Sequence, residues 1–121
     1  MATDSVTVDI GDVHPVWYQF RHRFTDEPME PDDPALHLED PDGEVSDVAI
    51  HLVTDEDELA AAVVAFAAKG VTLEDGTGLY GASLEPDKEG RWYYRWKGDG
   101  AAKAADQVGF NVRRRRVGEP A

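Results

Sequence analysis

The sequence predicts an α+β fold for a single small domain, with a mostly antiparallel sheet and helices packed on one face. Several segments alternate apolar and polar residues with a period of two, as strands do. In contrast, residues 55–69 place apolar side chains at helical spacing. The chain, 1–121, suits one domain because 121 residues can bury one modest core.

The N-terminal segment contains two predicted strands. Residues 5–10 alternate and predict a short strand, and His14-Pro15 interrupts the pattern. Residues 16–24 alternate again, so a strand there separates two sets of side chains onto opposite faces. One face would hold most of the apolar residues, and the other would carry Trp17, Gln19, Arg21 and Arg23.

Residues 25–47 are predicted to form a long, acidic, proline-rich loop. Prolines remove backbone donors and like charges repel each other, so regular structure is disfavoured there. The residues from Asp40 to Gly43 have the types that form turns. Residues 36–38 could pair briefly as an edge strand.

The main helix is predicted to follow a buried strand at 47–53. Thr54 fits the N-cap of a helix over 55–69, and acidic residues fill its first turn. Gly70 fits the left-handed position that ends such a helix. The predicted apolar stripe of the helix consists of Leu59, Val63, Phe66 and Ala67.

The C-terminal half is predicted to consist mainly of strands joined by turns that are rich in glycine and proline. A second, short helix is expected on the same face of the sheet as the main helix. The predicted elements are strands at 71–73 and 79–85, a hairpin loop at 86–90, a strand at 91–97, the short helix at 101–108, a strand at 110–117 and a frayed tail at 118–121.

The composition restricts the class of protein. Hydrophobic residues make up 41% of the chain, and there is no cysteine for a disulfide or a cysteine-based zinc site. No apolar run approaches the ~18 residues of a membrane span. The N-terminus lacks the basic and apolar regions of a secretory signal. We therefore expect a cytoplasmic protein with no membrane contact.

The chain is strongly acidic, with 25 Asp and Glu residues, 12 Lys and Arg residues and a formal net charge of −13. Three explanations stay open. The excess of Asp over Glu and the scarcity of lysine resemble the composition of proteins from salt-loving archaea. The acids could instead mimic nucleic acid or dock on a basic partner. They could also form a solvated surface with no specific role.

Positive charge is concentrated where strands are predicted. Nine of the 12 cations fall in the segments 21–23, 91–97 and 113–116. Alternation within 91–97 separates the aromatic residues, which could pack under the main helix, from a cationic strip on the other side. The candidate binding residues are Trp17, Arg21, Arg23, Arg91, Tyr93, Arg95, Lys97, Arg113 and Arg115.

Arginine and aromatic rings interleaved on an open sheet face suit single-stranded nucleic acid, because guanidinium groups contact phosphate and rings stack on bases. The alternative is that acids on neighbouring strands pair with these cations, or that the strip is only solvated. Residues 113–116 alternate faces if they form a strand. As a tail they could act together as an electrostatic anchor, and the sequence leaves both possibilities open.

His51 is a weak candidate for a metal ligand. The predicted order βαβββ over residues 48–97 resembles one half of a vicinal-oxygen-chelate (glyoxalase-like) domain. This resemblance implies a metal ligand on the first strand, which could match His51, and a carboxylate on a late strand. Residues 1–47 contain no predicted helix for a second such module, and the four histidines lack metal-ligand spacing.

Three functional hypotheses follow. The first is a small non-enzymatic binding or regulatory protein, without a cofactor, that presents its basic, aromatic-bearing sheet face to nucleic acid or to an acidic protein. The second is an acidic interaction protein of the nucleic-acid-mimic, anti-defence or immunity type that binds a basic partner. The third is the glyoxalase-like metal enzyme. The oligomeric state is left open.

Overall fold

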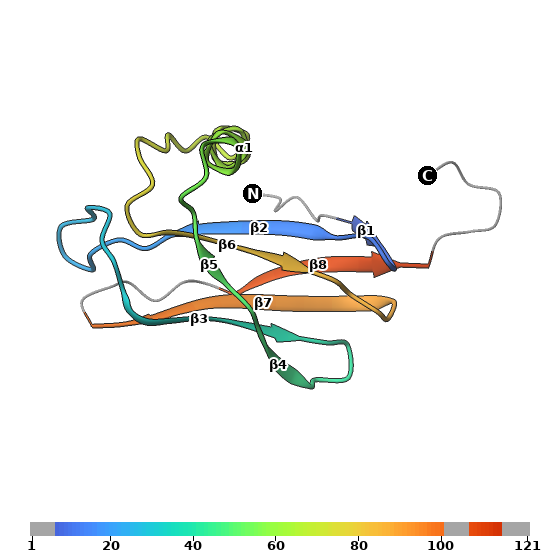
Figure 1. Cartoon of the computed structure of the whole chain (residues 1–121). Coiled ribbons are helices and arrows are strands. Elements are labelled where there is room, and N and C mark those ends of the chain that lie inside the picture. The colour runs from blue at the N-terminus through green and yellow to red at the C-terminus, as the bar shows by residue number, and fades with distance from the viewer. Residues whose placement is uncertain (1–6, 101–106, 115–121) are drawn as a thin grey trace.

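The computed structural model describes residues 7–100 and 107–114. Within these ranges the chain forms two sheets that pack face to face and one helix (Figure 1). The elements are β1 (Thr7–Asp9), β2 (His14–Gln19), β3 (Asp32–Glu39), β4 (Val45–Val48), β5 (His51–Leu52), α1 (Glu56–Ala67), β6 (Leu79–Leu84), β7 (Gly90–Asp99) and β8 (Val108–Arg113).

The larger sheet has five strands in the order β1-β8-β7-β3-β4, and the smaller sheet has three in the order β2-β6-β5. All strand pairs are antiparallel except β1 with β8. Figure 1 shows α1 on the side of the three-stranded sheet that faces away from the five-stranded sheet. The predicted α+β class with mostly antiparallel pairing is confirmed, and the strands are divided between two sheets.

The main core lies between the two sheets and is rich in aromatic rings. Trp92, Tyr94 and Trp96 alternate along β7 and all three are buried in it. The ring of Trp96 lies 6.2 Å from that of Tyr18 and 6.4 Å from that of Phe20, both contributed by the β2 segment. The prediction that these aromatic residues pack under the main helix was therefore wrong, because the three-stranded sheet lies between them and α1.

A second, smaller core lies between α1 and the three-stranded sheet. Its buried members are Val53, Ala62, Leu73 and Leu79, and Trp17, Leu59 and Phe66 pack against them. Both faces of the three-stranded sheet are thus covered. Two members of the predicted apolar stripe of the helix, Val63 and Ala67, are instead exposed, and Ala62 takes the buried position.

The ends of α1 follow capping rules. Asp55, and not Thr54, is the N-cap, and its side chain accepts a hydrogen bond from the backbone nitrogen of Glu58 at 3.0 Å. Gly70 adopts φ +79°, the left-handed conformation expected of a residue that ends a helix.

The prediction of one long loop over residues 25–47 was wrong from residue 32 onward. In the structure β3 occupies 32–39 and β4 begins at 45. β3 is an interior strand that pairs with both β4 and β7. Its alternating Leu36 and Leu38 are buried, and this burial outweighs the unfavourable composition. Pro34 is tolerated because it lies at a register shift between β3 and β7, where the regular hydrogen-bond ladder is interrupted.

The predicted strand at 47–53 is split in two. β4 belongs to the five-stranded sheet and β5 to the three-stranded sheet, so the chain crosses from one sheet to the other at residues 49–50 (Figure 1). Residues 71–73 form no strand, and residues 86–90 connect strands in different sheets and do not close a hairpin.

Several predictions fall wholly or partly outside the described residues. The predicted short helix at 101–108 lies there except for its last two residues, of which Val108 begins β8. The predicted tail at 118–121 lies there as well. No helix in the described ranges is long and apolar enough to cross a membrane.

Candidate functional site

The candidate site is the outer face of the five-stranded sheet, the side that faces away from the three-stranded sheet. Arg91, Arg95 and Lys97 project from β7 onto this face and are exposed, with the half-buried Tyr93 between them. The alternate residues of the same strand are buried in the main core. The alternation that the sequence predicted for residues 91–97 is therefore present in the structure.

Arg91 is held in a defined position on the outer face. Its guanidinium lies 5.6 Å from the centre of the Tyr93 ring, and its Nη1 donates a hydrogen bond of 3.1 Å to Asn111 Oδ1. The side chain passes over Gly109 on β8, where a Cβ atom would collide with the guanidinium. The absence of a side chain at residue 109 therefore creates the space that Arg91 uses.

Acidic residues on the neighbouring strands reduce the positive charge of the outer face. The pairing of β3 with β7 sets Glu39 beside Tyr93 and His37 beside Arg95. On β4, Asp47 lies opposite His37, and its Oδ1 is 2.8 Å from the His37 Nδ1. An exposed pair of this kind contributes about 0–1 kcal/mol.

A shallow groove of about 200 Å³ runs along the outer face beside Tyr93. It gives the face a concave site into which a flat or extended group could fit. Its lining on this face includes His37, Glu39, Val45, Tyr93 and Arg95. Lys97 lies further along β7 and has no ion-pair partner in the described part of the chain.

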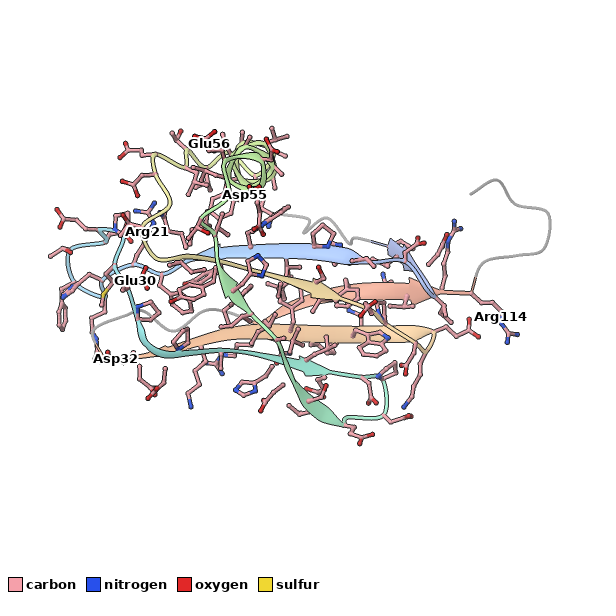
Figure 2. The ribbon with its side chains drawn as sticks, in the orientation of Figure 1. Arg21, Glu30, Asp32, Asp55, Glu56 and Arg114 are labelled. Carbon is pink, nitrogen blue, oxygen red and sulfur yellow. The ribbon has the colours of Figure 1, made fainter. Side chains whose placement is uncertain are left out.

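Arg113 extends the outer face onto β8, but it is engaged by a neighbouring carboxylate. Its Nε lies 2.6 Å from Asp9 Oδ1 on β1, the strand that pairs with β8. Arg114 follows the end of β8 (Figure 2), so the arginine run begins as a strand. Arg115, the last predicted binding residue, lies outside the described residues.

The other predicted cations are not on the outer face. Arg21 donates to the backbone oxygen of Asp26 at 2.8 Å and to Gln19 Oε1 at 2.9 Å, and so organises the turn after β2. Arg23 donates to the backbone oxygen of Gly100. Figure 2 shows Arg21 and Arg114 at opposite ends of the molecule. The three cationic segments therefore do not form one continuous strip.

Trp17 is also absent from the outer face, because it lies beneath α1 in the second core. Its Nε1 donates a hydrogen bond of 3.1 Å to Glu58 Oε2. The same oxygen lies 2.6 Å from the Nε2 of the exposed His51. His51 therefore has one carboxylate partner, and the described residues contain no cluster of three or more His, Cys, Asp or Glu that could hold a metal.

The glyoxalase-like order is also not reproduced. Within residues 48–97, two strands follow α1 where three were predicted. These two strands, β6 and β7, belong to different sheets. The metal-enzyme hypothesis therefore has no support from the described residues.

Sequence reasoning missed the contribution of β3 to the outer face. Within the predicted loop, His37 was given at most a brief edge strand and Glu39 no strand at all, yet they lie beside Arg95 and Tyr93 on an interior strand. The signal that could have found them is the alternation of Leu36 and Leu38, which puts the residues between and after them on the opposite face.

The chain matches no known family model, and no curated protein sequence matches it significantly. The chemistry of the outer face consists of exposed guanidinium and ammonium groups, the accessible aromatic ring of Tyr93 and a groove beside it.

Proposed function

We propose that this protein is a small non-enzymatic binding module whose outer face contacts single-stranded nucleic acid. The observation that carries the proposal is the exposed row of Arg91, Arg95 and Lys97 on β7, with the ring of Tyr93 between the first two. Alternate residues of a strand are about 6.7 Å apart, so an extended anionic chain lying along β7 could contact these cations in turn.

The chemistry of the row fits both parts of a nucleotide. Guanidinium groups bind phosphate oxygens through paired hydrogen bonds. Arg91 is already oriented by Tyr93 and Asn111, so little conformational entropy is lost when it engages a phosphate. A base stacked on Tyr93 would contribute about 1–3 kcal/mol.

The net charge of −13 opposes this interaction at long range. We therefore expect weak affinity and slow association at low salt. Added salt should weaken the binding less steeply than for a basic protein, because it screens the long-range repulsion together with the phosphate contacts.

Fluorescence anisotropy with an unstructured oligothymidylate tests the proposal. Replacing Arg91, Arg95 and Lys97 together by alanine should abolish binding. The matched control replaces Lys69, Lys88 and Arg114 by alanine, which removes the same charge from positions outside the row on β7. Equal binding curves for the two triple variants, or no binding by the unmodified protein, would contradict the proposal.

A second titration distinguishes nucleic acid from an acidic protein partner. Polyglutamate supplies negative charge without bases. Tyr93→Ala should weaken the binding of oligothymidylate and leave the binding of polyglutamate unchanged. If Tyr93→Ala changes neither, and polyglutamate binds as tightly as the oligonucleotide, the partner of the outer face is an acidic protein.

The second hypothesis, an acidic protein that binds a basic partner, is supported by the acidic residues at the N-terminal end of α1. Asp55, Glu56 and Asp57 are exposed there in succession. Binding of polylysine that falls in the double variant Glu56→Gln, Asp57→Asn would support this alternative. Polylysine binding that is unchanged in the double variant would assign the interaction to overall charge.

A further inference from the structure

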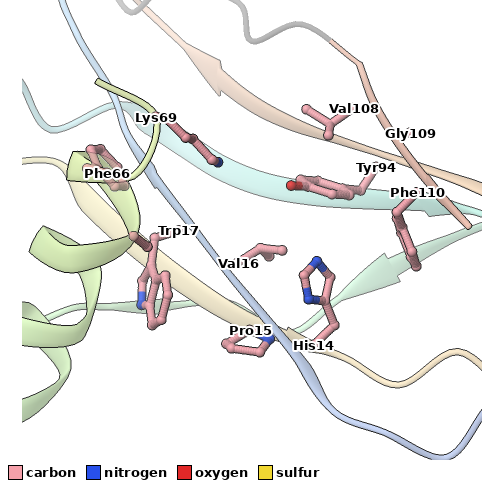
Figure 3. A pocket seen from close by; sticks show the side chains of 11 residues that line it. His14, Pro15, Val16, Trp17, Phe66, Lys69, Tyr94, Val108, Gly109 and Phe110 are labelled. Carbon is pink, nitrogen blue, oxygen red and sulfur yellow. The ribbon is translucent and has the colours of Figure 1, made fainter. Parts of the chain in front are cut away.

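A cavity of about 230 Å³ lies between the two sheets at their β2 and β8 side and reaches the C-terminal end of α1 (Figure 3). Its walls are mainly apolar and include Val16, Phe66 and Phe110. None of the described residues that line the cavity is Asp or Glu, although the chain contains 25 of them. The cavity thus differs from the acidic surface in both polarity and charge.

Tyr94 supplies a polar group that the fold itself does not use. The residue is 9% exposed, and its hydroxyl forms no hydrogen bond with any described residue. Figure 3 shows the hydroxyl end of the Tyr94 ring directed to the side of the cavity where Lys69 lies. Because Tyr94 lines the cavity, its hydroxyl is available there to donate a hydrogen bond to an acceptor on a ligand. Burial raises the pKa of Tyr94, which keeps the hydroxyl protonated as a donor.

Lys69 and His14 complete a set of three donors. Lys69 follows α1, and Figure 3 shows its ammonium directed into the cavity. No described acidic residue forms an ion pair with it. The imidazole of His14 packs against Phe110, with 5.5 Å between ring centres. Both residues line the cavity. Burial lowers the pKa of His14, and the positive charge of Lys69 lowers it further.

We propose that this cavity binds a small carboxylate that has an apolar body. The carboxylate would accept hydrogen bonds from Lys69 and Tyr94, and the apolar body would lie against Phe66, Val16 and Phe110. The cavity is smaller than the ~300–1,000 Å³ of sites for drug-sized ligands, so it suits an acid with a single ring or a short branched chain. This site is separate from the outer face and does not depend on the proposed nucleic-acid binding.

NMR titration of the full chain with phenylacetate tests this proposal. The titration is carried out in about 0.5 M potassium chloride, where the Debye length is roughly 4–5 Å and long-range repulsion by the protein is screened. Binding should shift the backbone amide signals of Phe66, Val108 and Gly109, which line the cavity. Saturable shifts at these amides are the expected result. Absence of shifts, or shifts confined to the outer face, would overturn the proposal.

Two related compounds test recognition of the carboxylate. Phenylacetamide has the same ring without the negative charge, and phenethylamine carries a positive charge in its place. Both should bind at least about tenfold more weakly than phenylacetate, the factor that corresponds to about 1.4 kcal/mol. Equal affinity for the acid and the amide would show that the cavity selects only the ring, and would overturn the assignment to carboxylates.

Two variants test the donors with little change to the fold. Tyr94→Phe removes only the hydroxyl, and Lys69→Met keeps most of the aliphatic stem while removing the charge. Each should weaken phenylacetate binding about tenfold. Lys88→Met, the matched control, removes the same charge from an exposed residue that does not line the cavity, and it should leave Kd unchanged. If Lys88→Met weakens binding as much as Lys69→Met, the effect is one of net charge and the proposed site is wrong.

Discussion

Trp17 Nε1 donates a hydrogen bond of 3.1 Å to Glu58 Oε2, and this bond attaches α1 to the three-stranded sheet. On β6, Gly81 pairs with Trp17 of β2 and with His51 of β5. Because Gly81 has no side chain, the carboxylate of Glu58 can pack against the sheet at this point. The helix is therefore fixed on the sheet by a polar contact as well as by the second core.

Trp17→Phe should lower the free energy of unfolding by about 1–3 kcal/mol, because the carboxylate of Glu58, 26% exposed, loses a donor and the second core loses volume. Urea unfolding measures the change. In a Glu58→Ala background the same substitution should cost less, since the bond is already absent. Additive effects of the two substitutions would show that the bond contributes nothing to stability.

Gly81→Ala should destabilise the protein by about 1–3 kcal/mol, the usual cost of inserting a group into a packed site. A Cβ atom there would lie 2.8 Å from Glu58 Oε2 and 2.8 Å from Trp17 Cδ1. The matched control is Gly76→Ala, whose Cβ atom would meet its nearest neighbour, the backbone oxygen of Val53, at an ordinary 3.6 Å. Thermal unfolding of both variants checks the prediction, and equal melting temperatures would contradict it.

His14 should make the protein less stable on acidification. Burial, followed by the charge of Lys69, lowers the pKa of His14 in the folded protein below its ordinary value of 6.5. The unfolded chain therefore binds the proton first. The contribution of His14 to stability is present above pH 6.5 and is lost as the pH falls from 6.5 toward the folded pKa.

This pH dependence can be measured by urea unfolding at about pH 7 and about pH 5.5. The free energy of unfolding should fall less over this interval in His14→Gln than in the unmodified protein. An NMR titration of Lys69→Met should show the His14 pKa moving back toward 6.5, since one of its two causes is removed. A His14 pKa above 6.5 in the unmodified protein would contradict the assigned cause.

Added potassium chloride should raise the melting temperature. The chain carries a net charge of −13, so its charges repel one another in the compact state. Screening shortens the Debye length from ~10 Å at 0.1 M to ~3 Å at 1 M. Thermal melts at several salt concentrations check this expectation. A melting temperature that is constant or falls with salt would count against adaptation to a saline solvent.

Local patterns in the sequence were sufficient to predict which residues share a face of a strand or helix. Alternation within 91–97 predicted the buried rings of β7 and its exposed cations, and both were confirmed. The acids of the first turn and Gly70 predicted a helix that was found at 56–67, slightly shorter than the predicted 55–69. These features depend on backbone geometry over a few residues, which the local sequence controls.

The tertiary structure decided what covers each face. Trp17 and Arg91 were both predicted to lie on the polar faces of their strands. In the structure Trp17 is covered by α1, whereas the side chain of Arg91 is exposed to solvent. The partner of Trp17, Glu58, is 41 residues away in the sequence. The crossing at 49–50 likewise depends on which sheet each half of the segment joins. Periodicity separates two faces of an element but contains no information about distant partners, and burial depends on those partners.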